Sequence, residues 1–211
     1  IIFEFIDGKT PKKIDKYQCY KLGQVLGLIH KASLKFKKKK KNDFSYVQWK
    51  KLIYTKFKLK TNDFIFLKNE IDFIINNWPK TLPSGIIHGD LFPDNVFFKK
   101  KQIAGIIDLS NACNDYFCYD LSICINSWCF NQKLDFIKCK NLIRGYNSER
   151  KLQKNEIYYL PFFLRASSLR FYLSRLMDSQ NKKIPKKYKK NPREYLNKLK
   201  YFQSNNLTNY F

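Results

Sequence analysis

The chain of 211 residues contains no hydrophobic run near the roughly 18 residues that a membrane-spanning helix requires, and no secretory signal peptide opens it. Its six cysteines include no C-x-x-C pair, so their spacing indicates neither a zinc site nor a disulfide framework. We therefore expect a cytoplasmic protein with no membrane partner, whose thiols are reduced and mostly buried.

Arginine and acidic residues are scarce. Only six of the 41 basic side chains are arginine, and 17 Asp and Glu residues leave a formal net charge of +24. A basic surface can bind nucleic acid, but arginine is the residue that recognises bases and phosphates with a planar fork. The lysines cluster at 37–41, 99–101 and 182–190, in apparent loops where solvated charge is usual. A basic nucleic-acid-binding protein is therefore the disfavoured alternative from a different class.

The hydrophobic content of 44% and the 17% of aromatic residues indicate a globular protein with enough material for a real core. Helical spacing of apolar residues is visible in several segments. It predicts helices over residues 14–31, 68–77, 121–130, 134–146, 157–177 and 193–202, the fifth interrupted near its start by Pro161. Residues 33–61 read as a surface loop followed by a short helix, and residues 111–119 as an irregular loop. His30, at a helix end, is expected to have a structural role.

The most informative segment is residues 88–95, His-Gly-Asp-Leu-Phe-Pro-Asp-Asn. Apolar residues precede it at 86–87 and follow it at 96–98, and a second apolar run, 103–107, ends at Asp108. This pattern predicts a strand, a loop, a short hairpin and an acidic residue at a strand end.

Phosphoryl transfer to a hydroxyl group needs these residue types. A carboxylate such as Asp90 can orient the hydroxyl and accept its proton. Mg²⁺ prefers oxygen ligands, which the amide of Asn95 and the carboxylate of Asp108 can supply. His88 is expected to position the loop rather than to move a proton. The alternative is that Asp90, Asp94 and Asn95 are only turn residues, and for Asp94 we favour a turn or supporting role.

The H-G-D-x-x-x-x-N pattern resembles the aminoglycoside phosphotransferase-like kinases, the small-molecule branch of the protein-kinase superfamily. A narrower resemblance, to homoserine kinases of that superfamily, lies in segments 108–115, 119–122, 126–129, 169–176 and 192–196. It implies transfer of the γ-phosphate of ATP to the side-chain hydroxyl of L-homoserine, with ATP and Mg²⁺ required. A same-fold kinase of another small alcohol, such as an aminoglycoside, choline or a sugar, is the alternative. The sequence does not indicate an oligomeric state.

The resemblance implies an α+β, protein-kinase-like large lobe that is mainly helical with a small catalytic hairpin. Residues 1–8 resemble the hinge between lobes, in which Glu4 and Ile6 are candidates for binding the adenine, and residues 9–211 resemble the C-terminal lobe. No glycine-rich phosphate loop precedes the catalytic loop, and the only methionine is Met177. We therefore expect that an N-terminal lobe is missing and that the chain alone is inactive.

The resemblance also suggests residues that contact the substrate or support the loop. An amino-acid carboxylate is recognised well by an arginine fork, so Arg170, in the stretch most like homoserine kinases, is the first candidate and Arg165 the second. A structural salt bridge is the equal alternative for both. Asp115 could bind the substrate ammonium, and a helix-capping or loop-bracing role is the equal alternative. Asp120 corresponds to an acidic residue that braces the catalytic loop.

Overall fold

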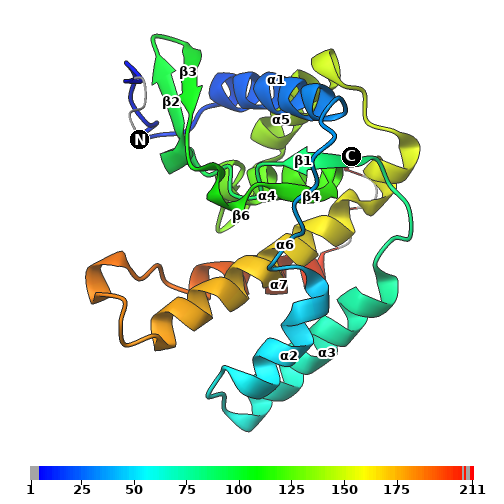
Figure 1. The fold of residues 1–211 in the computed structure, drawn as a ribbon, viewed down its shortest axis with the longest axis vertical. Helices are drawn as coiled ribbons and strands as arrows, with labels where there is room; N and C mark the ends of the chain where they lie inside the picture. The colour runs from blue at the N-terminus through cyan, green and yellow to red at the C-terminus, as the bar shows by residue number, and fades with distance from the viewer. Residues whose placement is uncertain (1–4, 206, 208–209) are drawn as a thin grey trace.

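The computed structural model describes residues 5–205, 207 and 210–211 (Figure 1). The helices are α1 (Lys16–Ser33), α2 (Tyr46–Thr55), α3 (Thr61–Asn77), α4 (Phe117–Trp128), α5 (Phe136–Glu149), α6 (Lys154–Gln180) and α7 (Arg193–Ser204). The strands are β1 (Ser84–Ile87), β2 (Val96–Lys99), β3 (Gln102–Ile106), β4 (Cys113–Tyr116), β5 (Phe130–Asn131) and β6 (Lys133–Leu134). Short 3₁₀ turns occur at η1 (Pro93–Asn95), η2 (Leu109–Asn111) and η3 (Lys186–Tyr188). The described chain is thus mainly helical with three two-stranded antiparallel ladders, an α+β arrangement.

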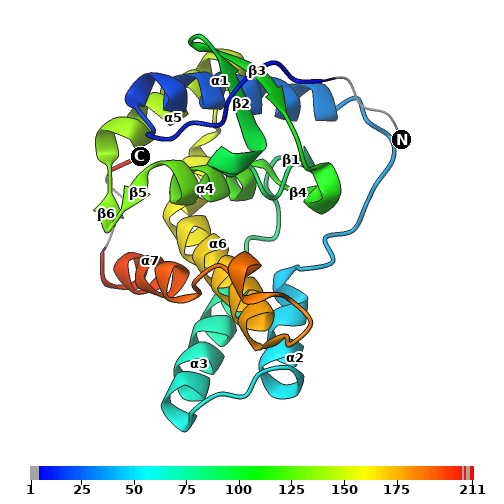
Figure 2. The same ribbon diagram turned by 90° about the vertical axis from the view of Figure 1, so that its left-hand side faces the viewer.

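The helices form an upper and a lower group joined by α6, as Figures 1 and 2 show. The upper group contains α1, α5 and α4 with the small strands, and the lower group contains α2, α3 and α7. The described residues form two hydrophobic cores, and α4, α6 and α7 each contribute to both; α6 places Leu160 and Leu164 in one core and Leu169 and Leu173 in the other. These shared cores fix the two groups relative to each other.

Helices α1 and α5 pack at very short range because each presents a glycine to the other. A side chain at Gly23 would collide with the backbone of Leu142, and one at Gly145 with the backbone of Tyr20. The start of α1 is set by a capping box, in which the carboxylate of Asp15 accepts from the amide of Gln18 at 2.8 Å. These contacts fix the position of α1, which contains His30 near its C-terminal end.

The central helix α4 is buried on every face; only Ser127 of its twelve residues is partly exposed. It begins at Phe117, earlier than residue 121, so that Asp120 lies in its first turn. The predicted irregular loop over 111–119 is wrong, because Cys113–Tyr116 forms β4 and pairs with β1. A four-residue strand containing Asn and Asp has no apolar alternation, so its pairing with a distant segment leaves no local signal.

Two other helices also differ from the prediction. Helix α6 continues through Pro161, which removes one intrahelical hydrogen bond without ending the helix. Helix α3 begins at Thr61, seven residues before the predicted start, whereas α7 and the hairpin β2–β3 confirm the predictions for 193–202 and for the hairpin. No helix in the described residues is long and apolar enough to cross a membrane. All six cysteines are free and buried, as predicted.

Candidate active site

The loop that follows β1 brings the predicted chemical groups to one place. Asp90, Asn95 and Asp108 all line an open groove of about 410 Å³, between the loop and the C-terminal half of α6. Asn95 ends η1, and its backbone carbonyl accepts from the amide of Ile107 at 3.0 Å, which brings the Asp108 strand end beside the loop. The structure therefore brings together the three residues that the spacing singled out.

His88 is 1% exposed, and among the described residues its imidazole hydrogen-bonds only to backbone groups. Its Nε2 lies 3.1 Å from the carbonyl oxygen of Ile107, and its Nδ1 lies 3.3 Å from the amide nitrogen of Asp90. Nε2–H therefore donates and Nδ1 accepts, which requires the neutral Nε2–H tautomer. The imidazole joins the loop to the strand end before Asp108, an arrangement that suits a positioning role.

Asp90 is partly buried, and burial raises the pKa of its carboxyl group, while the positive charge of Arg170 acts in the opposite direction. Its Oδ2 accepts a hydrogen bond of 3.2 Å from Nδ2 of Asn111. Sequence reasoning missed Asn111, because it lies in the turn η2 after Asp108 and only the folded chain brings it to Asp90. A carboxylate with a raised pKa at the wall of a groove is suited to accept a proton.

Asn95 and Asp108 leave oxygen atoms available to a cation. Nδ2 of Asn95 donates to the carbonyl of Asp90 at 2.9 Å, and its Oδ1 accepts no hydrogen bond from the residues that the structure describes. Asp108 has a left-handed backbone (φ 63°), and hydrogen bonds from Ser110 lower the pKa of its carboxyl group. The described residues contain no cluster of three or more His, Cys, Asp and Glu side chains suited to a metal. One carboxylate and one amide oxygen fit Mg²⁺ that is also held by nucleotide phosphates.

Asp120 holds the loop from below, as its predicted supporting role requires. Its Oδ2 accepts from the amide of His88 and its Oδ1 from the amide of Gly89, both at 2.9 Å. Gly89 has φ +74°, and a Cβ there would also lie 2.8 Å from the carbonyl oxygen of Asn111. The two amides can point at one carboxylate because glycine allows this turn.

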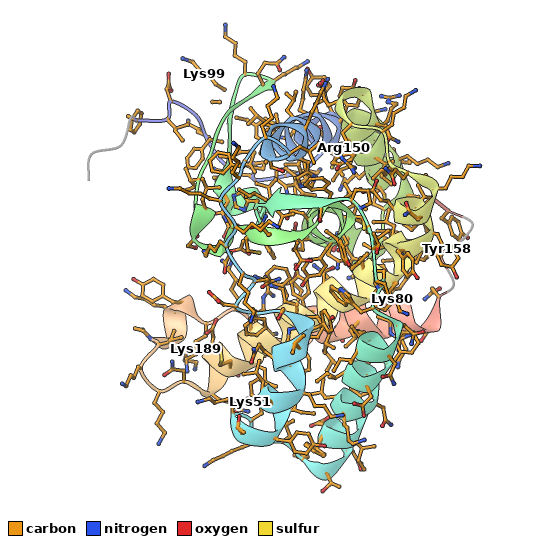
Figure 3. The ribbon with its side chains drawn as sticks, turned by 45° about the vertical axis from the view of Figure 1, so that its right-hand side comes forward. Lys51, Lys80, Lys99, Arg150, Tyr158 and Lys189 are labelled. Atoms are coloured by element: carbon orange, nitrogen blue, oxygen red, sulfur yellow. The ribbon has the colours of Figure 1, made fainter. Side chains whose placement is uncertain are left out.

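A buried polar chain continues from Asp120 into the upper core. Nε2 of His30 lies 3.1 Å from Asp120, and Nδ1 of His30 lies 2.7 Å from the hydroxyl of Tyr146. Arg150, which Figure 3 labels in the upper part of the molecule, donates to the same hydroxyl at 2.9 Å. It also forms a two-point ion pair with buried Glu156, at 3.0 and 3.1 Å. With His30 neutral, the donors and acceptors match in one direction, with Tyr146 donating to His30 and His30 donating to Asp120.

This chain makes stability depend on pH. Burial lowers the pKa of His30 from its ordinary value of 6.5, so the unfolded state binds more protons between the two pKa values. The free energy of unfolding should therefore fall as the pH is lowered from 7 through this window, with a slope of at most about 1.4 kcal/mol per pH unit. Denaturant unfolding of wild type and His30→Gln at several pH values measures it. A flatter profile is expected for the variant; identical slopes would contradict the assignment.

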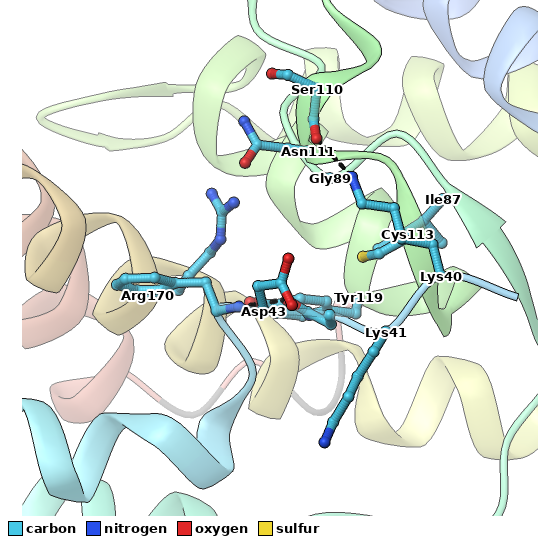
Figure 4. A pocket seen from close by; sticks show the side chains of 12 residues that line it. Lys40, Lys41, Asp43, Ile87, Gly89, Ser110, Asn111, Cys113, Tyr119 and Arg170 are labelled. Atoms are coloured by element: carbon cyan, nitrogen blue, oxygen red, sulfur yellow. Dashed lines mark hydrogen bonds between the residues drawn. The ribbon is translucent and has the colours of Figure 1, made fainter.

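Arg170 is 8% exposed and lies where the groove meets a second cavity of about 190 Å³. Its guanidinium stacks 4.1 Å from the ring of Phe171, yet it has no hydrogen-bond or ion-pair partner among the residues that the structure describes. In Figure 4 it points toward the side of the cavity that carries Asn111. A nearly buried guanidinium with free donors at a cavity wall is suited to bind an anionic group.

The other predicted residues lie elsewhere. Arg165 forms a two-point ion pair with Glu70 of α3 and lines neither the groove nor the second cavity. The carboxylate of Asp115 accepts from Asn42 at 2.6 Å and from the amide of Tyr116, and it faces a different surface hollow beside Trp78.

Asp94 lines the groove at its exposed edge, where it forms a salt bridge of 3.0 Å with Lys190. Of the last two candidates, Ile6 packs over Gly105 of the hairpin, and Glu4 lies outside the described residues.

Known proteins resemble this chain in both sequence and fold. Homoserine kinase of Nitrobacter hamburgensis is 39% identical over 214 residues, covering 96% of this chain and 64% of that protein. Homoserine kinase of Rhizobium etli is 38% identical, covering 95% and 64%. The chain thus spans slightly less than two thirds of the length of these relatives.

Solved structures show the same fold. An amicoumacin kinase, solved with AMP-PNP and Ca²⁺, superposes with a TM-score of 0.68 at 15% identity, covering 93% of this chain and 60% of that one. A choline/ethanolamine kinase family protein from Mesorhizobium loti gives 0.66 at 15% identity, covering 95% and 67%. These likenesses confirm the predicted kinase-like fold.

The model of the phosphotransferase enzyme family matches residues 1–147, which is well over half of the chain and includes the whole loop, the hairpin and the Asp120 brace. Asp90, Asn95 and Asp108 lie within this matched region, whereas the opposite wall of the groove, which α6 contributes, lies outside it. Sequence, fold and site therefore agree, and the chain belongs to the phosphotransferase enzyme family.

Proposed function

We propose that this chain carries the acceptor site of an ATP-dependent kinase that phosphorylates the side-chain hydroxyl of L-homoserine. The observation that carries the proposal is the convergence of Asp90, Asn95 and Asp108 on one groove whose wall contains the unpaired guanidinium of Arg170. The first three groups serve phosphoryl transfer to an alcohol, and the guanidinium serves an acceptor with a carboxylate. Homoserine has both groups.

The size of the second cavity favours a small acceptor. Its volume of about 190 Å³ lies below the roughly 300–1,000 Å³ of pockets that enclose drug-sized ligands. An aminoglycoside would have to remain largely outside it, whereas an amino acid would fit. Choline, a cationic alcohol, would find the guanidinium of Arg170 unfavourable.

The residues perform the reaction in the following way. Asp90 accepts the hydroxyl proton as the hydroxyl oxygen bonds to the γ-phosphorus of ATP and the bond to ADP breaks. Asn95 Oδ1 and the Asp108 carboxylate would hold Mg²⁺, which when bound neutralises charge on the phosphates. Asp120 and His88 keep the loop in place, and Asn111 orients the Asp90 carboxylate.

The proposal also includes the N-terminal segment and the lobe that follows it. Residues 1–8 would form the segment between the lobes, with Glu4 and Ile6 toward the adenine, and residues 9–211 the lobe that holds the acceptor. The pairing of Lys9 with Phe98, at 2.9 Å in both directions, supports this, because it places the segment against the catalytic hairpin. ATP phosphates would need further binding groups, so residues 1–211 alone should not phosphorylate homoserine.

The test is ADP release from Mg-ATP by the protein expressed from its full native reading frame. The acceptors are L-homoserine, L-threonine, L-serine, choline and kanamycin. We expect turnover that is strongest with homoserine. Preference for another alcohol would keep the phosphoryl-transfer site and reject the substrate, and no turnover by a folded protein would reject both.

Arg170→Gln should raise the KM for homoserine at least about tenfold, because a charge-assisted hydrogen bond contributes roughly 1.5–3 kcal/mol. The KM for ATP should change much less, since the guanidinium is placed at the acceptor side of the groove. Steady-state kinetics with each substrate varied in turn measures both. Arg144→Gln, at an exposed arginine whose hydrogen-bond partner is Asn141 of its own helix, is the matched control. Equal changes in the two KM values would contradict the role of Arg170.

A further inference from the structure

The second cavity has a wall made by one short segment, residues 40–44, between α1 and α2. Lys40, Lys41, Asn42, Asp43 and Phe44 all line it. On the other side the cavity is lined by the catalytic loop at Gly89, by η2 and by Arg170 (Figure 4). The segment is therefore placed to contact whatever part of the acceptor lies behind the reacting hydroxyl.

Strand β4 holds this segment in a defined position. The amide of Lys40 donates to the side chain of Asn114 at 2.7 Å, and the amide of Asn114 donates to the carbonyl of Lys40 at 2.8 Å. The side chain of Asn42 donates to Asp115 at 2.6 Å and accepts from the amide of Phe44 at 3.0 Å. These hydrogen bonds fix the positions of Asn42 and Phe44, and therefore also the backbone of the residue between these two in sequence.

That residue is Asp43, which is exposed at the mouth of the cavity that it lines. It has no ion pair and no hydrogen bond with the described residues, in a chain with 41 lysines and arginines. The lysines beside it do not approach it: Lys40 donates to the carbonyl of Ser110 at 2.7 Å, and Lys41 points away from the cavity in Figure 4. The cavity thus has one free anionic group and, in Arg170, one free cationic group.

We propose that Asp43 binds the α-ammonium group of the acceptor, so that the second cavity selects a zwitterionic amino alcohol through Asp43 and Arg170 together. This rests on the proposed function and adds a specificity-determining residue to it. The two charges enter from different elements, the 40–44 segment and α6, and both line the same small cavity. An ammonium and a carboxylate on one carbon would pair with the carboxylate of Asp43 and the guanidinium of Arg170. An acceptor that lacks either group would leave one of these two side chains unpaired. Asp115 then acts on the wall, by holding Asn42, and not on the ligand.

The test compares L-homoserine with two analogues, each lacking one charge. 4-Hydroxybutanoate has no ammonium group, and 3-aminopropan-1-ol has no carboxylate. The measured quantity is the ratio of kcat/KM for homoserine to that for each analogue, which does not depend on the amount of folded enzyme. Competition against homoserine gives the affinity of an analogue whose turnover is too slow to follow.

For Asp43→Asn we expect the homoserine/4-hydroxybutanoate ratio to fall about tenfold or more, because only homoserine loses a charge-assisted contact. Arg170→Gln should instead lower the homoserine/3-aminopropan-1-ol ratio. Asp63→Asn, which removes an exposed carboxylate at the start of α3, is the matched control and should change neither ratio.

If Asp43→Asn weakens homoserine and 4-hydroxybutanoate equally, or weakens neither, the inference is overturned while the proposed function stands. If the wild-type protein from the full reading frame does not phosphorylate homoserine at all, the proposed function fails and the inference fails with it. These two failures are distinguished by the wild-type measurement alone.

Discussion

Replacing Asp90 by asparagine should lower the turnover number by about 100-fold to 10,000-fold, which is the range that general-base assistance contributes. The amide has nearly the same shape and can still contact Asn111, but it cannot accept the proton of the hydroxyl group. The KM for ATP should change little. Steady-state phosphorylation by the protein from its full reading frame measures the effect.

Asp94→Asn is the matched control, because it makes the same chemical change four residues later in the same loop. The carboxylate of Asp94 is exposed and contacts only Lys190, so its loss should change turnover by no more than a few-fold. Activity of Asp90→Asn close to that of Asp94→Asn would show that Asp90 is a turn residue and not the base.

Replacing Asp120 by alanine should destabilise the protein by about 3–5 kcal/mol, because three buried donors lose their acceptor and each unsatisfied donor costs roughly 1–3 kcal/mol. The substitution leaves the amides of His88 and Gly89 and the Nε2–H of His30 without an acceptor inside the protein. For a chain of this length the melting temperature should fall by roughly 10 °C. Denaturant and thermal unfolding measure both quantities.

Ser127→Ala is the control within the same helix, because the hydroxyl of Ser127 bonds only to carbonyl groups of its own helix. Its effect on stability should be below about 1 kcal/mol. The pKa of Asp120 is relevant here: burial alone would raise it, but the hydrogen bond and charge of His30 and the bonds from the loop together lower it. An unfolding free energy of Asp120→Ala that equals that of Ser127→Ala would mean that the loop does not depend on this carboxylate.

The loop over residues 88–95 and the hairpin after it could be predicted from sequence because their structure is local. Residues 88–95 and Asp108 are close in sequence, and a strand, a turn and a hairpin require little from the rest of the chain. The helices with a strong apolar stripe, such as α1 and α7, could be predicted for the same reason. The brace by Asp120 was predictable only through the family resemblance.

Contacts between distant segments could not be predicted. β4 has no pattern of its own and exists because β1 pairs with it, and Asn111 and Asp43 reach the site only in the folded chain. The roles of the two arginines could not be predicted for the same reason. Arg165 and Arg170 are five residues apart on α6, yet Arg165 pairs with Glu70, and Arg170 pairs with no acidic residue that the structure describes.

The buried cysteines have a practical consequence. Burial raises the pKa of Cys113 to about 12 and raises those of Cys118, Cys124 and Cys129 well above their ordinary values, so almost no thiolate is present near neutral pH. Alkylating reagents attack thiolates, so labelling must wait for an opening event that admits water to the sulfur. Cys113 reports on the wall of the second cavity and Cys124 on the inside of α4. The alkylation rate of each native cysteine therefore measures how often the structure opens locally at that position.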